Sequence, residues 1–366
     1  MMKRKGPPLW LCLLLLFLAL GWRMIGAPLT GEEFSQAKTP LWQARILLPS
    51  RVQRVLRLWQ PSAITSAPQT LTEDAMDDEQ RSRQEDQTVL NVYLAQEGMI
   101  QPMTLSGYVC GVVAAEMPAS YHMEALKAQA VAARTRVWKQ RQEGGCSLHP
   151  GADICTDSAH CQGYATLKQC RQQWGSAYES YRDRVLLAER ETQNQLSTYE
   201  GEPITVLYHA ISGGRTEDAQ AVFSQSAPYL VSVHSDGEEQ TRGFTQEITL
   251  SFAEIAQRLT DAGWPLSANE VRRTLSVDAY TQTGRVASMQ AGGYRISGRD
   301  FRKALSLRST WFSMRTDVEN VTFVQRGYGH GVGMSQAGAN SMAAEGADYA
   351  AILTHYYPGV EISPLE

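Results

Sequence analysis

Residues 108–142 read "YVCGVVAAEMPASYHMEALKAQAVAARTRVWKQRQ" and join an apolar run to a helical pattern across one proline, Pro118. After that proline, four apolar residues recur at the spacing of one helical face: Leu126, Ala130, Ala133 and Val137. Outside this segment, apolar stretches predict strands at 88–94 ("TVLNVYL"), 204–211 ("ITVLYHAI") and 319–325 ("ENVTFVQ"). Because helices and strands mix without a βαβ rhythm, the sequence predicts a single mixed α+β domain.

The composition sets broad limits on function. The 366 residues are 43% hydrophobic and 20% charged, which is ordinary for a soluble globular protein with a sizeable core. The formal net charge of -4 provides no general basic surface, so a nucleic-acid partner is not expected.

The N-terminal residues predict membrane attachment. Three basic residues, Lys3, Arg4 and Lys5, precede the apolar run "PLWLCLLLLFLALGW" (8–22). Such a start is typical of an export signal or a short signal-anchor. We favour an uncleaved single-pass anchor over residues 1–29, with cleavage as the alternative. Residues 30–87 include the charged run "EDAMDDEQRSRQED" (73–86) and predict a polar tether, so that residues 88–366 form a domain outside the cytoplasm.

Glu116 is the candidate proton donor. It ends the apolar run two residues before Pro118, so the chain has to turn at this carboxyl group among small alanines. Apolar surroundings disfavour the charged form and raise the pKa of a carboxyl group towards the value that a general acid needs. The alternative is a structural ion pair with a basic residue such as Arg134.

A cysteine- and histidine-rich loop, "CSLHPGADICTDSAHC" (146–161), is a candidate metal site. Thiolates and imidazoles are the ligands that zinc prefers, although this spacing is not that of a zinc finger or ribbon. The alternative is a disulfide between Cys155 and Cys161, which an exported protein could form.

Two glycine-containing stretches are candidate ligand-binding segments. The stretch "RGYGHGVGMSQAGAN" (326–340) is neither a phosphate-binding loop nor a dinucleotide fingerprint, and its alternate glycines permit close approach of a ligand to the backbone. The stretch "YHAISGGRTED" (208–218) lacks the G-x-S-x-G pattern of a nucleophile elbow, so we expect Ser212 to bind a polar ligand. The alternative for the first stretch is a tight turn that buries His330.

Five stretches, in order, resemble the motifs of the stage II sporulation protein D family: 108–137, 208–218, "GRDFRKALSLRSTWF" (298–312), 326–339 and "ILTHYYPG" (352–359). The resemblance covers roughly residues 88–361. It implies a peptidoglycan lytic transglycosylase that cleaves the bond from N-acetylmuramic acid (MurNAc) to N-acetylglucosamine (GlcNAc) in peptide-stripped strands. The products have 1,6-anhydro-MurNAc ends, and the setting is septal wall remodelling and engulfment during endospore formation.

The resemblance also implies roles for individual residues. Glu116 matches the catalytic acid of the family, and one carboxyl group suffices because the sugar's own 6-hydroxyl is the nucleophile. The implied zinc ligands are His149, Cys155 and Cys161, in a structural role. We infer a glycan-binding groove that faces Glu116, with these residues contacting the substrate: Arg134, His209, Ser212, Gly213, Gly214, Thr216, His330, Gly331, Ser335 and Gln336.

The implied setting is the mother-cell membrane, with the domain facing the forespore. The implied partners are stage II sporulation protein P, an amidase and endopeptidase, and the membrane protein stage II sporulation protein M. Two other functions remain as alternatives. One is a wall-binding module without catalytic activity, similar to amidase enhancers, and the other is a zinc amidase or peptidase that uses the cysteine–histidine loop.

Overall fold

The computed structural model describes residues 88–223 and 226–365. The predicted anchor (1–29) and tether (30–87) lie outside these residues. Among the helices of the described residues, none is both long and apolar enough to cross a membrane.

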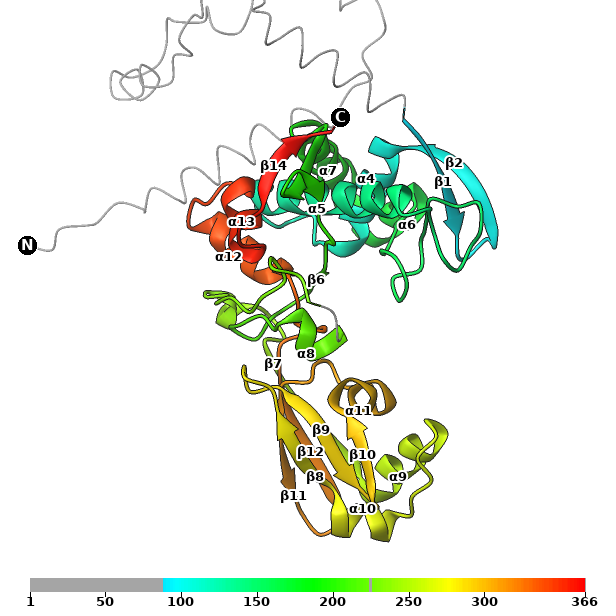
Figure 1. The fold of residues 1–366 in the computed structure, drawn as a ribbon, viewed down its shortest axis with the longest axis vertical. Helices are drawn as coiled ribbons and strands as arrows, with labels where there is room; N and C mark the ends of the chain where they lie inside the picture. The colour runs from blue at the N-terminus through cyan, green and yellow to red at the C-terminus, as the bar shows by residue number, and fades with distance from the viewer. Residues whose placement is uncertain (1–87, 224–225, 366) are drawn as a thin grey trace, which may run out of the picture. The chain divides into compact units, whose positions relative to one another are not determined.

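The described residues form an α+β fold, as the sequence predicts (Figure 1). The elements follow in this order: β1 (Val89–Leu94), β2 (Met99–Thr104), α4 (Leu105–Glu116), α5 (Met123–Gln142), β3 (Ile154–Cys155), α6 (Leu167–Trp174), η3 (Gly175–Ala177), α7 (Tyr178–Arg190), β4 (Gln195–Tyr199), β5 (Glu202–Pro203), β6 (Tyr208–His209), α8 (Ala219–Phe223), η4 (Glu238–Gln240), β7 (Thr245–Ser251), α9 (Phe252–Asp261), α10 (Ala268–Thr274), β8 (Ser276–Tyr280), β9 (Val286–Ala291), β10 (Tyr294–Ser297), α11 (Gly298–Leu305), β11 (Phe312–Thr316), β12 (Asn320–Arg326), β13 (Met334–Ser335), α12 (Gln336–Ala344), α13 (Tyr349–Tyr356) and β14 (Glu361–Pro364).

Helix α5 is the centre of the first hydrophobic core. The four residues of the predicted helical face are fully buried: Leu126, Ala130, Ala133 and Val137. Alanines on the other sides, such as Ala128 and Ala132, are buried as well, because α4, α7, α12, α13 and β4 all contact this helix. Small side chains let these neighbours approach α5 closely, which accounts for its alanine-rich sequence.

Helix α4 has a clear start and a clear end. The Thr104 side chain caps it by accepting a hydrogen bond from the Gly107 N–H. It ends at Glu116 because Met117, which precedes Pro118, is extended (φ -118°, ψ 142°). The turn at the carboxyl group that the sequence predicts is therefore present.

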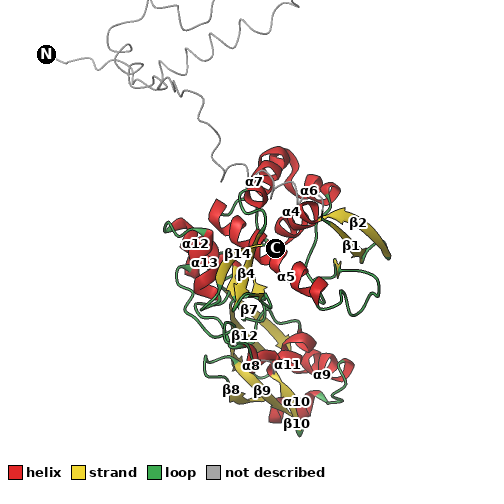
Figure 2. Ribbon diagram, turned by 45° about the horizontal axis from the view of Figure 1, so that its top comes forward, coloured by secondary structure: helices red, strands yellow, loops and turns green. Residues whose placement is uncertain are grey.

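Residues 245–326 form a second hydrophobic core, which we call the β lobe and which the sequence did not predict. It contains two antiparallel three-stranded sheets, in the orders β10-β9-β8 and β11-β12-β7. Helices α9, α10 and α11 lie beside these strands (Figure 2). The rings of Phe301, Phe312 and Phe323 meet in its centre, with centroids 5.6–6.1 Å apart.

The remaining strands form small sheets, in the orders β2-β1-β3, β14-β4-β5 and β13-β6. The last of these matters for the site, because it pairs two of the predicted ligand-binding stretches in parallel. Met334 lies opposite Tyr208, and Ser335 lies opposite His209.

Candidate active site

Glu116 lies at the carboxyl end of α4, and its side chain is half-buried. Its Oε1 accepts a hydrogen bond of 2.7 Å from the backbone N–H of Gly163, and the Gln336 side chain also hydrogen-bonds the carboxyl group. Burial raises the pKa of Glu116, whereas the two hydrogen bonds and the Arg136 charge act in the opposite direction but leave the pKa raised. Glu116 therefore keeps its proton to a higher pH than an exposed glutamate does.

Gly163 is fitted closely to Glu116. A Cβ at this position would lie only 2.9 Å from Glu116 Oε1, so glycine leaves room for the hydrogen bond. The neighbouring Gln162 is buried and accepts a bond of 2.9 Å from the Tyr208 hydroxyl. Burial and the Glu116 charge raise the pKa of Tyr208. The Tyr208 hydroxyl therefore belongs to the same site as Glu116. The sequence analysis did not predict Gly163 and Tyr208 as site residues, because only the three-dimensional structure shows that they lie at Glu116.

Arg136, and not Arg134, is the basic residue of the site. Its guanidinium donates to the Val206 carbonyl (3.1 Å) and to the His160 carbonyl (3.2 Å). Arg134 is fully buried and forms an ion pair of 3.2 Å with the buried Glu189. The prediction that Arg134 contacts substrate or pairs with Glu116 is therefore wrong, because two positions along a helix turn a side chain by about 200°.

The cysteine–histidine cluster comprises Cys146, Cys155, His160 and Cys161, whose ligand atoms all lie within 4.8 Å of one another. His149, the histidine that the sequence analysis placed in this set, lies elsewhere. Its ring stacks on Tyr93 with the centroids 3.5 Å apart. The expected ligand set is thus corrected to His160 in place of His149, with Cys146 added. Cys155 and Cys161 are both free thiols in the described residues, so the disulfide between them is not formed there.

The donor set of this cluster fits zinc. Zinc–sulfur and zinc–nitrogen bonds in a tetrahedral site separate the sulfur and nitrogen atoms by about 3.5 Å. His160 Nδ1 lies 3.6, 3.4 and 3.2 Å from the sulfur atoms of Cys146, Cys155 and Cys161. His160 Nε2 lies 3.1 Å from the Ser147 hydroxyl, and an outer partner of this kind orients a metal-bound imidazole.

Ser212, Thr216 and Ser335 are fully buried, so the predicted contact of their side chains with substrate is wrong for this structure. Their neighbour is the buried carboxylate of Glu238, which sequence reasoning missed. Its Oε2 accepts bonds from the N–H (3.0 Å) and hydroxyl (2.8 Å) of Ser212 and from the Gly213 N–H (3.0 Å). Its Oε1 accepts from the Ser335 hydroxyl. Glu238 thus connects the two predicted ligand-binding stretches, 208–218 and 326–340. The Thr216 hydroxyl has a different partner and accepts a hydrogen bond from the Val233 N–H (2.8 Å).

His209 and His330 lie side by side, with ring centroids 5.6 Å apart, and both serve the packing of the chain. His209 is buried and its Nδ1 donates to the Val332 carbonyl (3.1 Å). His330 Nδ1 accepts from the Val332 N–H (3.1 Å), and the His330 ring also bonds the backbone of Tyr208. Burial and the Arg302 charge lower the pKa of His330 to about 4, and burial also lowers that of His209. Both rings are therefore neutral at pH 7.

The glycines of residues 326–340 are needed for contacts within the chain. Gly333 has φ +68°, and a Cβ there would lie 2.0 Å from the Leu207 carbonyl oxygen. At Gly331, a Cβ would lie 2.7 Å from the Arg285 guanidinium. These close contacts agree better with the alternative prediction, a tight turn, than with a backbone surface that is open to a ligand. Gly214 has more room, since the nearest atom to its Cβ position is an Arg326 nitrogen at 3.7 Å.

Gln336 is the one residue of the predicted substrate-binding set that reaches Glu116. It begins α12 directly after β13, and its Nε2 also lies 3.2 Å from Gln129 Oε1. The parallel pairing of β13 with β6 therefore carries both Gln336 and Tyr208 to the carboxyl group.

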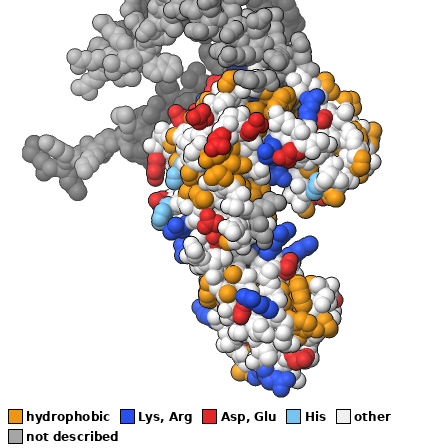
Figure 3. Space-filling view, viewed as in Figure 1, with side chains coloured by type: hydrophobic (Ala, Val, Ile, Leu, Met, Phe, Trp, Pro, Cys, Tyr) orange, Lys and Arg blue, Asp and Glu red, His pale blue; other side chains and the backbone are white. Residues whose placement is uncertain are grey.

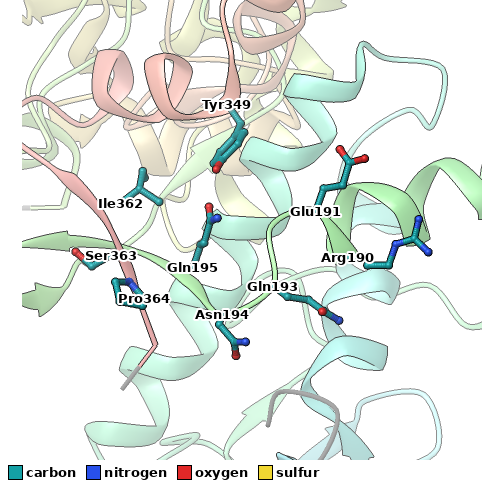
Figure 4. Close-up of a pocket in the computed structure, with 9 residues that line it drawn as sticks. All are labelled: Arg190, Glu191, Gln193, Asn194, Gln195, Tyr349, Ile362, Ser363 and Pro364. Carbon is teal, nitrogen blue, oxygen red and sulfur yellow. The ribbon is translucent and has the colours of Figure 1, made fainter. Parts of the chain in front are cut away.

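An open depression begins beside Glu116 at the exposed Ala115. Its lining is one aromatic ring, that of Tyr164, together with Ala165 and three amide side chains: Gln169, Gln172 and Gln173. A polar cavity of about 490 Å³ lies at another place, along the end of α7, β4 and β14 (Figure 4). None of the predicted site residues lines that cavity.

These features define an α+β protein that holds a partly buried carboxyl group beside a cysteine–histidine cluster. The family described as "Stage II sporulation protein" matches residues 93–199, which contain both features. Over 272 residues, the chain is 36% identical to stage II sporulation protein D of Bacillus amyloliquefaciens and 35% identical to that of Bacillus subtilis. Each match covers 74% of this chain and 78% of the relative. The chain belongs to the stage II sporulation protein D family.

A third relative carries a different name. The chain is 29% identical over 305 residues to a Bacillus subtilis protein named amidase enhancer. This match covers 69% of the chain and 40% of that protein.

Proposed function

We propose that this protein is a peptidoglycan lytic transglycosylase with Glu116 as its single acid and base. The observation that carries the proposal is the state of the Glu116 carboxyl group, whose pKa burial raises and which two hydrogen-bond donors hold in place. The substrate is the MurNAc–GlcNAc bond of peptide-stripped glycan strands, which would lie along the depression that starts at Ala115.

The charges that shift the pKa of Glu116 are consistent with a transglycosylase. A glycoside hydrolase needs a second carboxylate to activate water or to attack the sugar. Among the described residues, the charged group that shifts the pKa of Glu116 is Arg136, and no second carboxylate contributes. One carboxyl group is sufficient if the nucleophile belongs to the substrate.

The reaction then has two proton transfers through one residue. Protonated Glu116 donates its proton to the glycosidic oxygen as the bond from MurNAc C1 breaks, and GlcNAc leaves as the alcohol. The carboxylate that remains accepts the proton of the MurNAc 6-hydroxyl while that oxygen bonds to C1, which closes the 1,6-anhydro ring. Gly163 and Gln336 stabilise the carboxylate between the two steps, and the field of Arg136 does the same.

We propose that the cluster of Cys146, Cys155, His160 and Cys161 holds zinc in a structural role. Zinc would fix the loop that ends at Gly163, two residues after Cys161, and so keep the donor to Glu116 in place. Arg136 supports the same loop through the His160 carbonyl.

The proposal extends to the cellular setting. A single-pass anchor in residues 1–29 would place the domain between the mother-cell membrane and the forespore, where it acts in septal wall remodelling and engulfment. Stage II sporulation protein P would supply the peptide-stripped strands, and stage II sporulation protein M would be a membrane partner.

A second candidate function rests on the match to an amidase enhancer. In that case the protein would bind glycan and stimulate a partner hydrolase without cleaving the strand itself.

The test is mass spectrometry of peptide-free glycan strands after incubation with the full-length chain or its Glu116→Gln form. Anhydro-MurNAc ends from the first and none from the second are expected. Reducing ends would instead indicate a hydrolase. Absence of cleavage by either form would favour the amidase-enhancer alternative.

A further inference from the structure

A basic pocket of about 390 Å³ lies at the edge of the β lobe, on α11, the segment that follows it and the nearby Tyr328. Its lining includes four cations and one exposed aromatic ring: Arg299, Arg302, Lys303, Arg308 and Tyr328. No carboxylate lines it. In Figure 3, lysine and arginine side chains gather over α11, at the lower edge of the hollow in the profile.

The positive charge of this pocket has no carboxylate in ion-pair contact among the described residues. Within residues 88–223 and 226–365, none of its four cations forms an ion pair, whereas Arg295 and Arg315 of the same lobe do. Arg302 Nε donates only to carbonyl groups, and Arg308 Nη1 donates to the neutral Gln246. The Nε atom of Arg308 is buried and has no hydrogen-bond partner in the part of the chain that the structure describes. Unbalanced, partly buried guanidinium groups are the usual composition of a site for an anion.

The pocket has a suitable surface for a sugar as well. Tyr328 is 47% exposed, and the Arg308 guanidinium lies 4.2 Å from its ring centroid, which holds the ring in one orientation. An exposed and fixed aromatic face of this kind packs against the apolar face of a pyranose. The pocket therefore combines a cluster of cations with an exposed aromatic face.

Contacts run from the pocket to the site of Glu116. Arg299 lies over the ring of Phe223 at 5.5 Å, and Phe223 meets His330 edge-on at 5.4 Å. The His330 ring bonds the backbone of Tyr208, whose side chain lies at Glu116. This series of contacts connects the basic pocket to the residues around Glu116.

We propose that this pocket binds the free lactyl carboxylate of a MurNAc residue distant from the bond that is cleaved. The inference rests on the proposed function, since it identifies how the same glycan is selected. In an intact strand this carboxyl group is an amide bonded to the stem peptide and is neutral. Removal of the peptide creates a carboxylate, and the four cations distinguish the two states by charge.

The experiment measures binding separately from cleavage. Full-length Glu116→Gln protein is titrated with fluorescently labelled glycan strands whose lactyl carboxyl groups are either free or capped as methylamides. The protein should bind the free strands about 10-fold more tightly, as one charge-assisted hydrogen bond would provide. Lys303→Gln and Arg302→Gln, each added to Glu116→Gln, should weaken binding of the free strands and leave binding of the capped strands unchanged.

Two controls make the result specific. Arg273→Gln removes an exposed positive charge from α10 of the same lobe and should keep the preference for free strands, which excludes a general charge effect. Lys303 is exposed on the surface, so its substitution tests the pocket even if Arg302→Gln fails to fold. Inorganic phosphate at millimolar concentration tests for a phosphate site.

The outcomes separate this inference from the proposed function. Equal binding of free and capped strands overturns the inference, even if the protein with Glu116 intact cleaves both. Displacement by phosphate together with equal binding of the two strands overturns it in favour of a phosphate site. A preference for free strands that depends on Lys303 supports the inference, even if cleavage is never observed and the proposed function fails.

Discussion

Replacement of Gly163 by alanine tests how the Glu116 carboxyl group is held. The backbone φ of Gly163 is outside the left-handed region, so alanine fits the backbone. The added Cβ would lie 2.9 Å from Glu116 Oε1 and 3.4 Å from Glu116 Cδ. The substitution therefore acts on the carboxyl group and leaves the fold in place.

The size of the effect follows from these distances. Ordinary van der Waals contact begins near 3.4 Å, so the carboxyl group has to retreat by about 0.5 Å. The hydrogen bond from Gly163, now 2.7 Å, would lengthen to about 3.2 Å and lose much of its strength. Misplacement of a catalytic group by 1 Å can slow a reaction about 100-fold, so we expect a loss of about 10- to 100-fold in kcat.

The pH dependence should change in a definite direction. The Gly163 hydrogen bond lowers the pKa of Glu116, so weakening it raises that pKa further. Because the first step of the proposed reaction needs the protonated acid, the alkaline limb of the profile should move to higher pH while the maximum rate falls. The assay is quantitation of anhydro-MurNAc ends between pH 4 and 9.

Gly107→Ala is the matched control for this experiment. Gly107 lies within α4, the helix that ends at Glu116. A Cβ added at Gly107 would contact only the Thr104 hydroxyl, at 3.0 Å. Cleavage by Gly107→Ala should equal that of the unmodified protein. If Gly163→Ala cleaves at the unmodified rate with an unchanged alkaline limb, the N–H of Gly163 does not set the state of Glu116.

Three further predictions concern stability and metal content. Glu116→Gln should raise Tm at pH 8 but not at pH 4 in thermal unfolding. The pKa of Glu116 is raised in the folded state, so the protonated carboxyl group contributes stability below the unfolded pKa, and this stability is lost as pH rises through the folded pKa. Glutamine carries no charge at either pH and avoids that loss. His160→Ala should abolish bound zinc in elemental analysis whereas His149→Ala should keep it, and the reverse result would restore the ligand set expected from the sequence. Arg134→Met should lower the free energy of unfolding in urea by about 3 kcal/mol through loss of the buried pair with Glu189, with KM unchanged. A raised KM at unchanged stability would contradict that prediction.

Local sequence signals predicted part of the fold. The proline rule predicted the turn at Glu116, where α4 ends, and helical spacing predicted the buried face of α5, because both depend on residues within one or two turns. The β lobe was missed, since its core joins residues that are distant in sequence, such as Phe301 and Phe323. No local pattern states that such residues share one core rather than two.

The same limit explains the errors at the site. His149 and His160 occur in one loop, and the path of that loop decides which ring reaches the cysteines. The pairing of β3 with β1 takes the loop past Tyr93, and the His149 ring stacks on the Tyr93 ring. His160 is therefore the histidine that reaches the cysteines. Arg134 and Arg136 differ only in helical phase, and the partners of the two faces are invisible in the sequence.

The polar motifs that contain Ser212 and Ser335 have a different role from the one their sequences suggest, because they bind the buried carboxylate of Glu238. Serine and glycine beside a carboxylate resemble a sugar-binding surface, yet Ser212 and Ser335 point into the interior and bond Glu238. Since Ser335 directly precedes Gln336, this anchor fixes the start of α12 and with it the donor to Glu116. A single carboxyl group that must serve first as acid and then as base needs donors that do not move between the two steps. The motifs therefore contribute to the proposed chemistry by fixing the position of Gln336. The surfaces around these motifs, and not the motifs themselves, would contact the substrate.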